Sequence, residues 1–398
     1  MFLWDWICRD DKMDMMYVED CCEILDSMRV PIVASEREEG EYPYYGANGI
    51  QDYVADYIFD DELVLLAEDG GNFGSRERPI AYRVSGKCWV NNHAHVLKPK
   101  DELDVDYLCY SLMFYKVDGM VNGATRQKLT QAAMRKMQIP SRSMDEQKQI
   151  VDELNRIIKI KKQRQKELVL LDDLIKARFV EMFGDPYVNP LKWKKLKIKD
   201  AVIIEPQNGL YKPQSDYVTD GTGIPILRID GFYDGMVTDF ASLKRLKCSE
   251  TERQRYLLLE DDIVINRVNS IEYLGKCAHI KELLEDTVYE SNMMRMHFDP
   301  EYYNPVYICK LLCSQFIYDQ IVNHAKKSVN QASINQIDVL DFNIYQPPLD
   351  LQNEFADFVY QVDKSKSAKA MKEFNCHIIY YMLHFIQNDF NKNNLNEK

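Results

Sequence analysis

An internal repeat is the feature of this 398-residue sequence that most constrains its fold. Residues 129–157 align with residues 334–362 without a gap, at a constant offset of 205. Five positions are identical: Gln131/Gln336, Ile139/Ile344, Asp145/Asp350, Gln147/Gln352 and Asp152/Asp357. Apolar residues coincide at Leu129/Ile334, Met134/Val339, Met137/Phe342, Ile139/Ile344, Met144/Leu349, Ile150/Phe355, Leu154/Val359 and Ile157/Val362. In each copy a strand-like alternation leads into a helix start marked by Asp and Gln, and then into apolar residues at helical spacing. A chain built from two copies of one unit is expected to do one thing twice.

Length and composition agree with two domains joined by helices. At 398 residues, with 46% hydrophobic and 28% charged residues, each half can bury its own core. No uncharged stretch approaches the roughly 20 apolar residues that cross a bilayer. Asp5 interrupts the segment where an export signal would need an apolar run. We therefore expect a globular protein of the cytoplasm. Its ten cysteines contain no CxxC pair, so they are predicted to be packing residues.

Each half contains the same order of predicted elements. In the first half, residues 63–67, 79–84 and 87–91 are predicted as strands, and residues 105–116 as an amphipathic helix. In the second half, residues 262–267 match the first of these strands and residues 305–323 match the helix. Since the order is kept and the loops differ, a common scaffold presenting two different surfaces is predicted.

A long helix follows each unit. The first is predicted from Asp145 to about Met182, with a Gly184-Asp185-Pro186 exit, and the second begins at Pro347-Pro348-Leu349. Apolar spacing alternating between three and four predicts that the two helices pair antiparallel. At 1.5 Å per residue, the first would be roughly 55 Å long and could act as a spacer. The predicted partner-helix seam consists of Ile150, Leu154, Ile157, Leu168, Leu171, Ile175, Phe355, Val359, Val362, Met371, Phe374 and Ile378.

Several sequence segments, taken together, resemble those of the specificity subunits of type I restriction-modification systems. The resemblance runs from about Tyr17 to Phe385. It is carried by residues 44–53 (YYGANGIQDY), 65–70 (LLAEDG), 90–97 (VNNHAHVL), 127–131 (QKLTQ), 170–186 (LLDDLIKARFVEMFGDP) and 347–352 (PPLDLQ).

The resemblance implies an α+β fold with pseudo-two-fold symmetry. Two similar mixed α/β target-recognition domains would be joined by two long antiparallel coiled-coil helices. The implied divisions are an extension at 1–15, the first recognition domain at 16–144, a central spacer helix at 145–186, the second recognition domain at 187–346, and a second spacer helix with its tail at 347–398.

The resemblance also implies a non-catalytic reader of double-stranded DNA. Each recognition domain would read one half of a bipartite asymmetric site. Methyltransferase subunits, two of them by analogy, would dock and bring S-adenosylmethionine, and a restriction subunit could join. The alternative is a scaffold whose two related domains join proteins on a coiled coil without reading DNA.

Candidate base-reading residues are polar side chains in the variable loops, because Arg pairs with guanine and Asn or Gln with adenine. In the first half they are Tyr44, Asn48, Gln51, Arg76, Arg78, Arg126 and Gln127. In the second half they are Tyr211, Lys212, Arg228, Asp230, Arg267, Asn269, Ser270, Lys326, Lys327, Asn330 and Gln331. For each residue alone, a surface turn or a local cap remains the alternative.

Charge gives a second, local indication. The net charge of −13 excludes DNA binding through an overall positive field. Residues 156–166 nevertheless hold Arg156, Lys159, Lys161, Lys162, Arg164 and Lys166. This basic strip is either the solvated face of a long helix or a surface that faces phosphates.

Motifs for metal binding or catalysis are weak. His93 and His95 share one face of a predicted strand without an acidic or Cys partner at ligand spacing, so a structural strand end is predicted rather than a metal site. An adenine methyltransferase would need Asn or Asp, two prolines and an aromatic ring in succession. Gln346-Pro347-Pro348-Leu349 lacks the ring, and the sequence contains no Walker A motif. No enzymatic activity is therefore predicted for this chain.

Overall fold

The computed structural model describes residues 14–369 apart from positions 124–125, 234, 238 and 330. These residues form two compact units, which meet within one continuous helix between Glu167 and Leu168. Unit 1 comes before this point, and unit 2 runs from Leu168 to Ala368.

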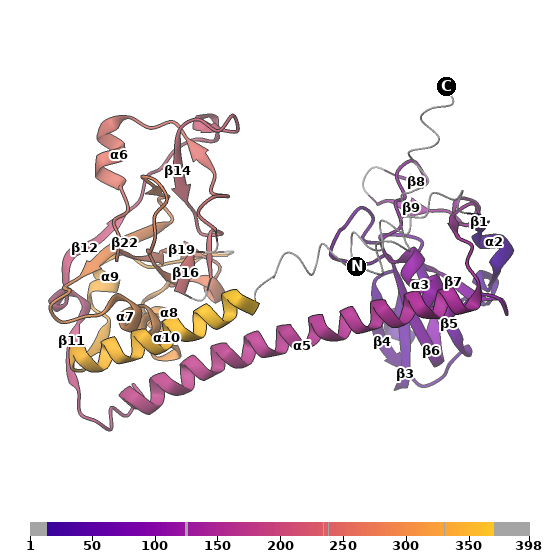
Figure 1. The fold of residues 1–398 in the computed structure, drawn as a ribbon, viewed down its shortest axis with the longest axis horizontal. Helices are drawn as coiled ribbons and strands as arrows, with labels where there is room; N and C mark the ends of the chain where they lie inside the picture. Colours follow the sequence, from indigo (N-terminus) through magenta and orange to yellow (C-terminus); the bar gives the residue numbers. More distant parts are fainter. Residues whose placement is uncertain (1–13, 124–125, 234, 238, 330, 370–398) are drawn as a thin grey trace. The chain divides into compact units, whose positions relative to one another are not determined.

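Unit 1 is built on a six-stranded sheet of order β2-β7-β5-β6-β3-β4 (Figure 1). Its strands are β2 (Cys22–Ile24), β3 (Glu39–Gly46), β4 (Gly49–Val54), β5 (Phe59–Ala67), β6 (Ala81–Val90) and β7 (Ala94–Pro99). Two small ladders pair β1 (Met15–Tyr17) with β10 (Gln138–Pro140) and β8 (Val121–Asn122) with β9 (Lys128–Leu129). The helices are α2 (Val18–Cys21), α3 (Val105–Met113) and α4 (Gln131–Arg135). Leu108 and Leu112 of α3 share a core with Val64 and Leu66, so this helix covers one face of the sheet.

Unit 2 also has a six-stranded sheet, of order β12-β22-β18-β20-β16-β15. Its strands are β12 (Val202–Asn208), β15 (Phe232–Tyr233), β16 (Gly235–Val237), β18 (Ile263–Asn266), β20 (Cys277–His279) and β22 (Met293–Phe298). Smaller sheets contain β11 (Lys194–Lys197) with β25 (Asn343–Gln346); β13 (Tyr217–Val218), β17 (Arg245–Leu246), β14 (Ile224–Leu227) and β21 (Val288–Tyr289); and β19 (Val268–Asn269), β24 (Ala332–Ser333) and β23 (Lys326–Lys327). The shorter helices are α6 (Glu250–Tyr256), α7 (Pro305–Leu312), α8 (Gln315–His324) and α9 (Gln336–Leu340).

The two large sheets have the same pattern of strand directions. Along each of the orders given above, three antiparallel pairings are followed by one parallel pairing and then by one antiparallel pairing. The parallel pairing joins β6 to β3 in unit 1 and β20 to β16 in unit 2. The duplication seen in the sequence is therefore a duplication of sheet topology.

A buried glutamine explains one identity of the repeat. Gln147 is fully buried; its Oε1 accepts from the backbone N–H of Asp104 (2.7 Å), and its Nε2 donates to the carbonyls of Glu102 and Arg142. Gln352 is equally buried and makes the equivalent bonds to Asn304 (2.9 Å), Tyr302 and Pro347. Asp104 and Asn304 are the N-caps of α3 and α7. The glutamine thus ties the start of each long helix to the capped start of the shorter helix in its own unit.

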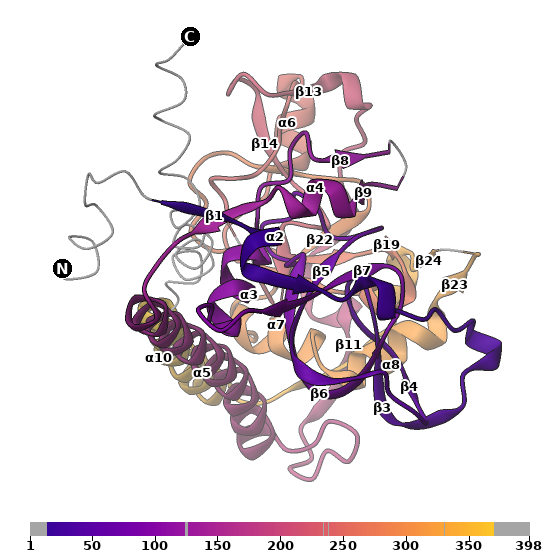
Figure 2. The same cartoon turned by 90° about the vertical axis from the view of Figure 1, so that its right-hand side faces the viewer.

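The two long helices are α5 (Met144–Phe183) and α10 (Leu349–Lys369). Within unit 2, Arg178 of α5 pairs with Glu354 (3.0 Å) and Asp172 pairs with Lys366 (2.5 Å). Because the higher number on one helix meets the lower number on the other, the helices run antiparallel, side by side in Figure 1 and in Figure 2. The predicted antiparallel pairing and α+β fold class are confirmed.

The seam residues fall into three groups. Ile175, Phe355, Val359 and Val362 are buried in one core, against which Leu171 packs. In unit 1, Leu154 is buried, Ile150 packs against the core below α3, and Ile157 is half-buried, as is Leu168 at the start of unit 2. Met371, Phe374 and Ile378, with the rest of the predicted second spacer, lie outside the described residues. The prediction omitted Phe179 and Phe183, whose rings contact Phe355 at centroid distances of 5.5 and 5.4 Å.

The structure corrects three details of the predicted elements. Residues 79–84 and 87–91 are not two strands, because β6 continues through Gly86, which pairs with Asp61 at φ 74°. The helix predicted at 305–323 is two helices, because it breaks at Cys313 and Ser314 is the N-cap of α8. The start of each repeat copy contains a short helix, α4 or α9, before its strand. Among the described helices, none is both long enough and apolar enough to span a bilayer.

Candidate nucleic-acid interface

In unit 1, the end of β5 brings three loops together. The backbone N–H groups of Glu68 and Asp69 both donate to the carbonyl of His93, at 2.8 and 3.3 Å. The carbonyl of Glu68 in turn accepts from the N–H of Leu129 (2.7 Å). The turn before β7 and the strand β9 are therefore fixed on either side of residues 68 and 69.

Asp69 holds one of the predicted reading residues. Its carboxylate lies 2.5 Å from Nε of Arg126 and 3.4 Å from Nδ1 of His93. The Arg126 side chain is 59% exposed, so the guanidinium is oriented by Asp69 and still faces solvent. The neighbouring Gly70, at φ 68°, donates its N–H to the carbonyl of Gln127. Arg126 and Gln127 are thus placed on the surface by contacts that the sequence pattern did not indicate.

A buried ionic network lies below this surface. Glu68 pairs with Arg29 (2.6 Å) and with Lys128 (3.1 Å). His95, which is fully buried, places Nδ1 2.7 Å from Asp26 and Nε2 2.9 Å from the carbonyl of Leu129. Burial by itself would raise the pKa of Asp26 and of Glu68. The hydrogen bonds from His95, Val96 and Gln131 to Asp26, and those from Arg29 and Lys128 to Glu68, outweigh burial and hold both pKa values below their ordinary range.

Three side chains of this network are spaced as metal ligands would be, but they already have partners in the protein. One ligand atom each from Asp26, Glu68 and His95 lies within 4.8 Å of the others. Both ring nitrogens of His95 already have partners, Asp26 at 2.7 Å and the Leu129 carbonyl at 2.9 Å. Since Arg29 also pairs with both carboxylates, the arrangement favours an ion-pair network over a metal site. No acidic partner of His95 was predicted from the sequence, because Asp26 and Glu68 lie far from it along the chain and meet it only in the folded unit.

The other candidates of unit 1 differ in accessibility. Tyr44 is 1% exposed, and its hydroxyl contacts the backbone of Ile32, so it is a core residue and we remove it from the candidate DNA contacts. Asn48 and Gln51 are exposed. The Asn48 side chain donates to the Gly70 carbonyl (3.0 Å), and the Gln51 side chain accepts from Nδ2 of Asn91 (3.0 Å). These bonds place both residues beside the Asp69 loop. Arg76 and Arg78 are exposed on the loop between β5 and β6.

In unit 2, Arg267 occupies the position that Glu68 has in unit 1. Its N–H donates to the carbonyl of Asn292 (2.9 Å), and its carbonyl accepts from the N–H of Ile334 (3.0 Å). Nη1 of Arg267 donates to the carbonyl of Ser291 (3.2 Å), and the Ser291 N–H donates to Leu210. Tyr211, 77% exposed, follows directly. The structure thus brings Arg267 and Tyr211 close together from sequence positions far apart.

Two candidate cations of unit 2 are paired with acids. Lys212 lies 2.9 Å from Glu252 and 3.6 Å from Asp216, and hydrogen bonds from the Ser249 backbone and from Lys212 lower the pKa of Glu252 to about 2. Arg228 lies 3.8 Å from Asp230 and 3.6 Å from Glu290, whose pKa is raised by burial. The ion pairs of Lys212 stabilise the fold locally, and this lysine is less available to DNA than the exposed candidates.

The remaining candidates of unit 2 surround the small sheet β19-β24-β23. Lys326 and Lys327 form β23 and are exposed, whereas Asn269 of β19 and the adjacent Ser270 are half-buried. The carbonyl of the exposed Gln331 accepts from Ser328 at the turn of the β23–β24 hairpin. Asn330 lies outside the described residues. Pairing of β19 with β24 brings this hairpin beside Arg267.

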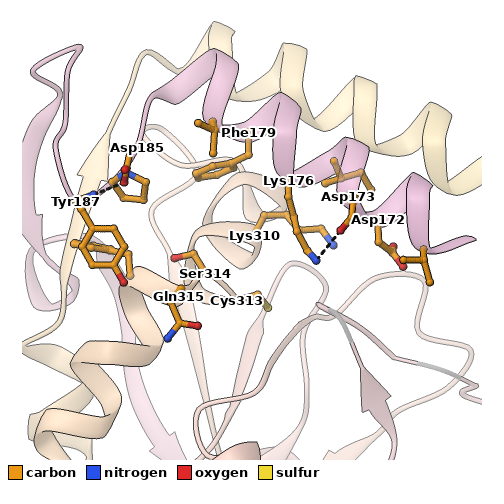
Figure 3. Close-up of a pocket in the computed structure, with 15 residues that line it drawn as sticks. Asp172, Asp173, Lys176, Phe179, Asp185, Tyr187, Lys310, Cys313, Ser314 and Gln315 are labelled. Carbon is orange, nitrogen blue, oxygen red and sulfur yellow. Dashed lines mark hydrogen bonds and ion pairs between the residues drawn. The ribbon is translucent and has the colours of Figure 1, made fainter.

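A pocket of about 770 Å³ also lies in unit 2, between the last part of α5 and the junction of α7 with α8 (Figure 3). Phe179 and Val180 contribute apolar surface, and Lys176 pairs with Asp173 at its edge (3.2 Å). None of the predicted reading residues lines this pocket.

The described parts of the chain thus present two loop clusters on one kind of scaffold, which defines a duplicated two-domain protein. Residues 10–170 match the sequence profile of the family described as the type I restriction modification DNA specificity domain. A putative type I restriction enzyme specificity subunit of Haemophilus influenzae is 37% identical over 134 residues, which are 34% of this chain and 34% of that protein. The specificity subunit of the type I restriction enzyme EcoKI from Escherichia coli is 24% identical over 319 residues, covering 76% of this chain and 68% of that protein.

Solved structures show the same fold. The crystal structure of the type I restriction-modification S subunit from M. genitalium aligns with a TM-score of 0.54 at 12% identity, covering 95% of this chain and 96% of that chain. A structure from work on complex assembly of the type I restriction-modification system aligns equally well, at 14% identity. The resemblance inferred from the sequence is confirmed: residues 10–170 match this family, and the chain is similar along most of its length to specificity subunits of type I restriction-modification systems.

Proposed function

We propose that this chain is the DNA-specificity subunit of a type I restriction-modification complex, and that each recognition domain reads one half of a bipartite, asymmetric site. The first domain would be residues 16–144 and the second residues 187–346, with residues 145–186 and 347–398 as spacer helices and residues 1–15 as an extension. In this proposal the chain acts in the cytoplasm, where its DNA lies.

The observation that carries the proposal is a common frame with different side chains at the surface. Equivalent backbone hydrogen bonds hold Glu68 between His93 and Leu129, and Arg267 between Asn292 and Ile334. The exposed groups around these two points differ: Arg126, Gln127 and Asn48 in unit 1, Tyr211 and the β23 lysines in unit 2. Two similar frames with different donors and acceptors suit the reading of two different half-sites.

Partners follow from the same proposal. Methyltransferase subunits, two in number, would dock on the chain and supply S-adenosylmethionine, and a restriction subunit would join where the system has one. The cations near the loop clusters are partly neutralised by Asp69, Glu68, Glu252 and Glu290, and the chain carries a net charge of −13. We therefore expect weak binding to DNA by the chain alone and firm binding by the assembled complex.

The proposal is tested in two steps, by mapping methylation and then by measuring DNA binding. Mapping methylated adenines across the genome, in cells with and without this chain, identifies the candidate bipartite site. The complex of this chain with its methyltransferase is then titrated with that duplex and with random duplex at moderate salt. We expect a preference of at least about a thousandfold for the bipartite duplex. Equal binding to both duplexes would contradict the reader function and favour the scaffold alternative.

A further inference from the structure

The middle of α5 is the part of unit 1 with the strongest local charge. Residues 154–166 contain six cations and no acid, whereas Glu153 and Glu167 stand at either side. These residues form one helical stretch near the centre of α5. In a chain with a net charge of −13, such an acid-free stretch is a local exception.

Three of the six cations form a row. Lys159, Lys162 and Lys166 are three and four residues apart, so they lie on one helix face, and all three are exposed. Arg156 and Arg164 are instead paired on the helix with Glu153 (2.5 Å) and Glu167 (2.7 Å). Across the described residues, no acid lies within ion-pair distance of the three lysines. We call Lys159, Lys162 and Lys166 the lysine row.

The lysine row continues the helix face that packs on unit 1. Asn155, four residues before Lys159, accepts a hydrogen bond from the Tyr110 hydroxyl of α3 (2.6 Å). Val151, one turn earlier, is buried in the core below α3. A ligand that extends along this side of unit 1 beyond α3 can therefore meet the lysine row.

The chemistry of the row fits a phosphodiester backbone. From Lys159 to Lys166 the helix rises about 10 Å, and duplex DNA carries one negative charge per roughly 1.7 Å, so about six phosphates span this length. From Asn155 to Lys166 this face presents ammonium groups and an amide, and its exposed apolar residues, Val169 and Leu170, come only after the row. Lysine is depleted in the cores of protein interfaces, and it binds phosphate as a point charge. The observations favour DNA over an acidic protein surface.

We propose that the lysine row contacts phosphates of the duplex between the two half-sites, without reading its sequence. The inference rests on the proposed function, and it adds a second surface to the reading loops. The lysine row lies on α5 beyond the residues that pack on unit 1 and before the helix enters unit 2 at Leu168, so DNA that extends along the helix past the first recognition domain would meet it there. The row then supplies affinity, and the loops supply sequence preference.

The test is the salt dependence of DNA binding by the assembled complex with methyltransferase. The triple variant Lys159→Gln, Lys162→Gln, Lys166→Gln is compared with the unaltered chain on the bipartite duplex and on random duplex. Each lost phosphate contact lowers the slope of log K against log salt by about 0.9, so we expect a slope smaller by about 2 to 3. Affinity for both duplexes should fall by a similar factor, with the sequence preference unchanged.

A matched control removes the same charge elsewhere. Lys194, Lys195 and Lys199 of unit 2 are exposed, and the triple change of these residues to Gln should leave the slope nearly unaltered. An unchanged slope in the lysine-row variant, in a complex that still prefers the bipartite duplex, would overturn this inference and keep the proposed function. If the lysine-row variant no longer holds the methyltransferase when DNA is absent, the row binds a protein partner and this inference is overturned. A complex with no preference before any substitution would instead reject the proposed function.

Discussion

Units 1 and 2 place different chemistry at the same point of one frame. In unit 1, Glu68 follows β5, and Leu66 of that strand pairs with His95, which belongs to a buried ionic network with Asp26. In unit 2, Arg267 follows β18, and Ile265 pairs with the buried Met294. Gln131 of the repeat donates to the Asp26 carboxylate, and its counterpart Gln336 donates to the Pro206 carbonyl. The backbone pairing is kept, while at this strand position the buried ionic group His95 is replaced by the apolar Met294.

The comparison shows which interactions define the scaffold. Backbone hydrogen bonds and the buried glutamines recur in both units, so the scaffold depends on them. Charged groups near the loops do not recur, so they are free to set the properties of each unit separately. Four sets of substitutions, from the largest expected effect to the smallest, can contradict or refine this distinction.

Asp26→Asn should destabilise unit 1 and spare unit 2. Removing one partner of a buried charge network costs about 3 kcal/mol or more at about pH 7. The pKa of Asp26 is held below its ordinary value, so its carboxylate stabilises the folded state above that ordinary value, and the contribution disappears as the pH falls through the folded-state pKa. The difference between the variant and the original chain should therefore shrink as the pH falls below the ordinary pKa range of an aspartate. Hydrogen exchange read peptide by peptide measures each unit.

The exposed Asp20 serves as the control, and Asp20→Asn should change the free energy of unfolding by less than about 0.5 kcal/mol. Equal loss of protection in both units after Asp26→Asn would show that the network is not local to unit 1.

Gln147→Met and Gln352→Met should have similar effects, each in its own unit. Either change leaves a buried N–H without its acceptor and two carbonyls without their donor, which costs about 2 kcal/mol. Amide exchange at Asp104 should rise in the first variant and at Asn304 in the second. If only one of the two variants markedly loses stability in its unit, the equivalent hydrogen bonds do not contribute equally to the stability of the two units.

Arg267→Ala and Arg76→Ala should each relax one half-site. A guanidinium that pairs with a guanine contributes about 1 to 3 kcal/mol of discrimination. Binding of the assembled complex to duplexes with single-base changes in either half-site measures the effect. If either substitution weakens both half-sites equally, the two units do not read DNA independently.

Asp69→Asn should have the smallest effect, because the Asp69–Arg126 pair is on the surface. The free energy of unfolding should change by less than about 1 kcal/mol. Preference for the correct base in the first half-site should fall by about two- to fivefold, since Arg126 loses the group that orients it. Glu77→Gln on the neighbouring exposed loop is the matched loss of one negative charge, and it should leave that preference unchanged.

The sequence predicted the parts of the fold that depend on local pattern. The long helix expected at about 145–182 is α5, Met144–Phe183, because apolar spacing and the Gly184 exit are local signals. The break at Cys313 was missed because Ser314 is a weak signal inside a continuous amphipathic pattern. The aromatic contacts of Phe179 and Phe183 were missed because the predicted seam on this helix ended at Ile175.

The candidate site was predicted less completely than the fold. Loop composition indicated Arg126 and Arg267, and both lie beside the end of the equivalent central strand. Tyr44 was misplaced, because a Tyr in a Gly-rich loop looks the same in sequence whether its ring points outward or into the core. Which of the remaining side chains touch bases stays a prediction.

The sequence by itself determined that this protein is a duplication, where its long helix begins, and which family it resembles, because repeats, caps and helical periodicity are local patterns of neighbouring residues. Only the tertiary structure decided that Asp26 and Glu68 meet His95, that Asp69 holds Arg126, and that Arg267 stands where Glu68 stands in the other unit. These pairs join residues far apart along the chain, and the register between strands, not the local pattern, brings them into contact.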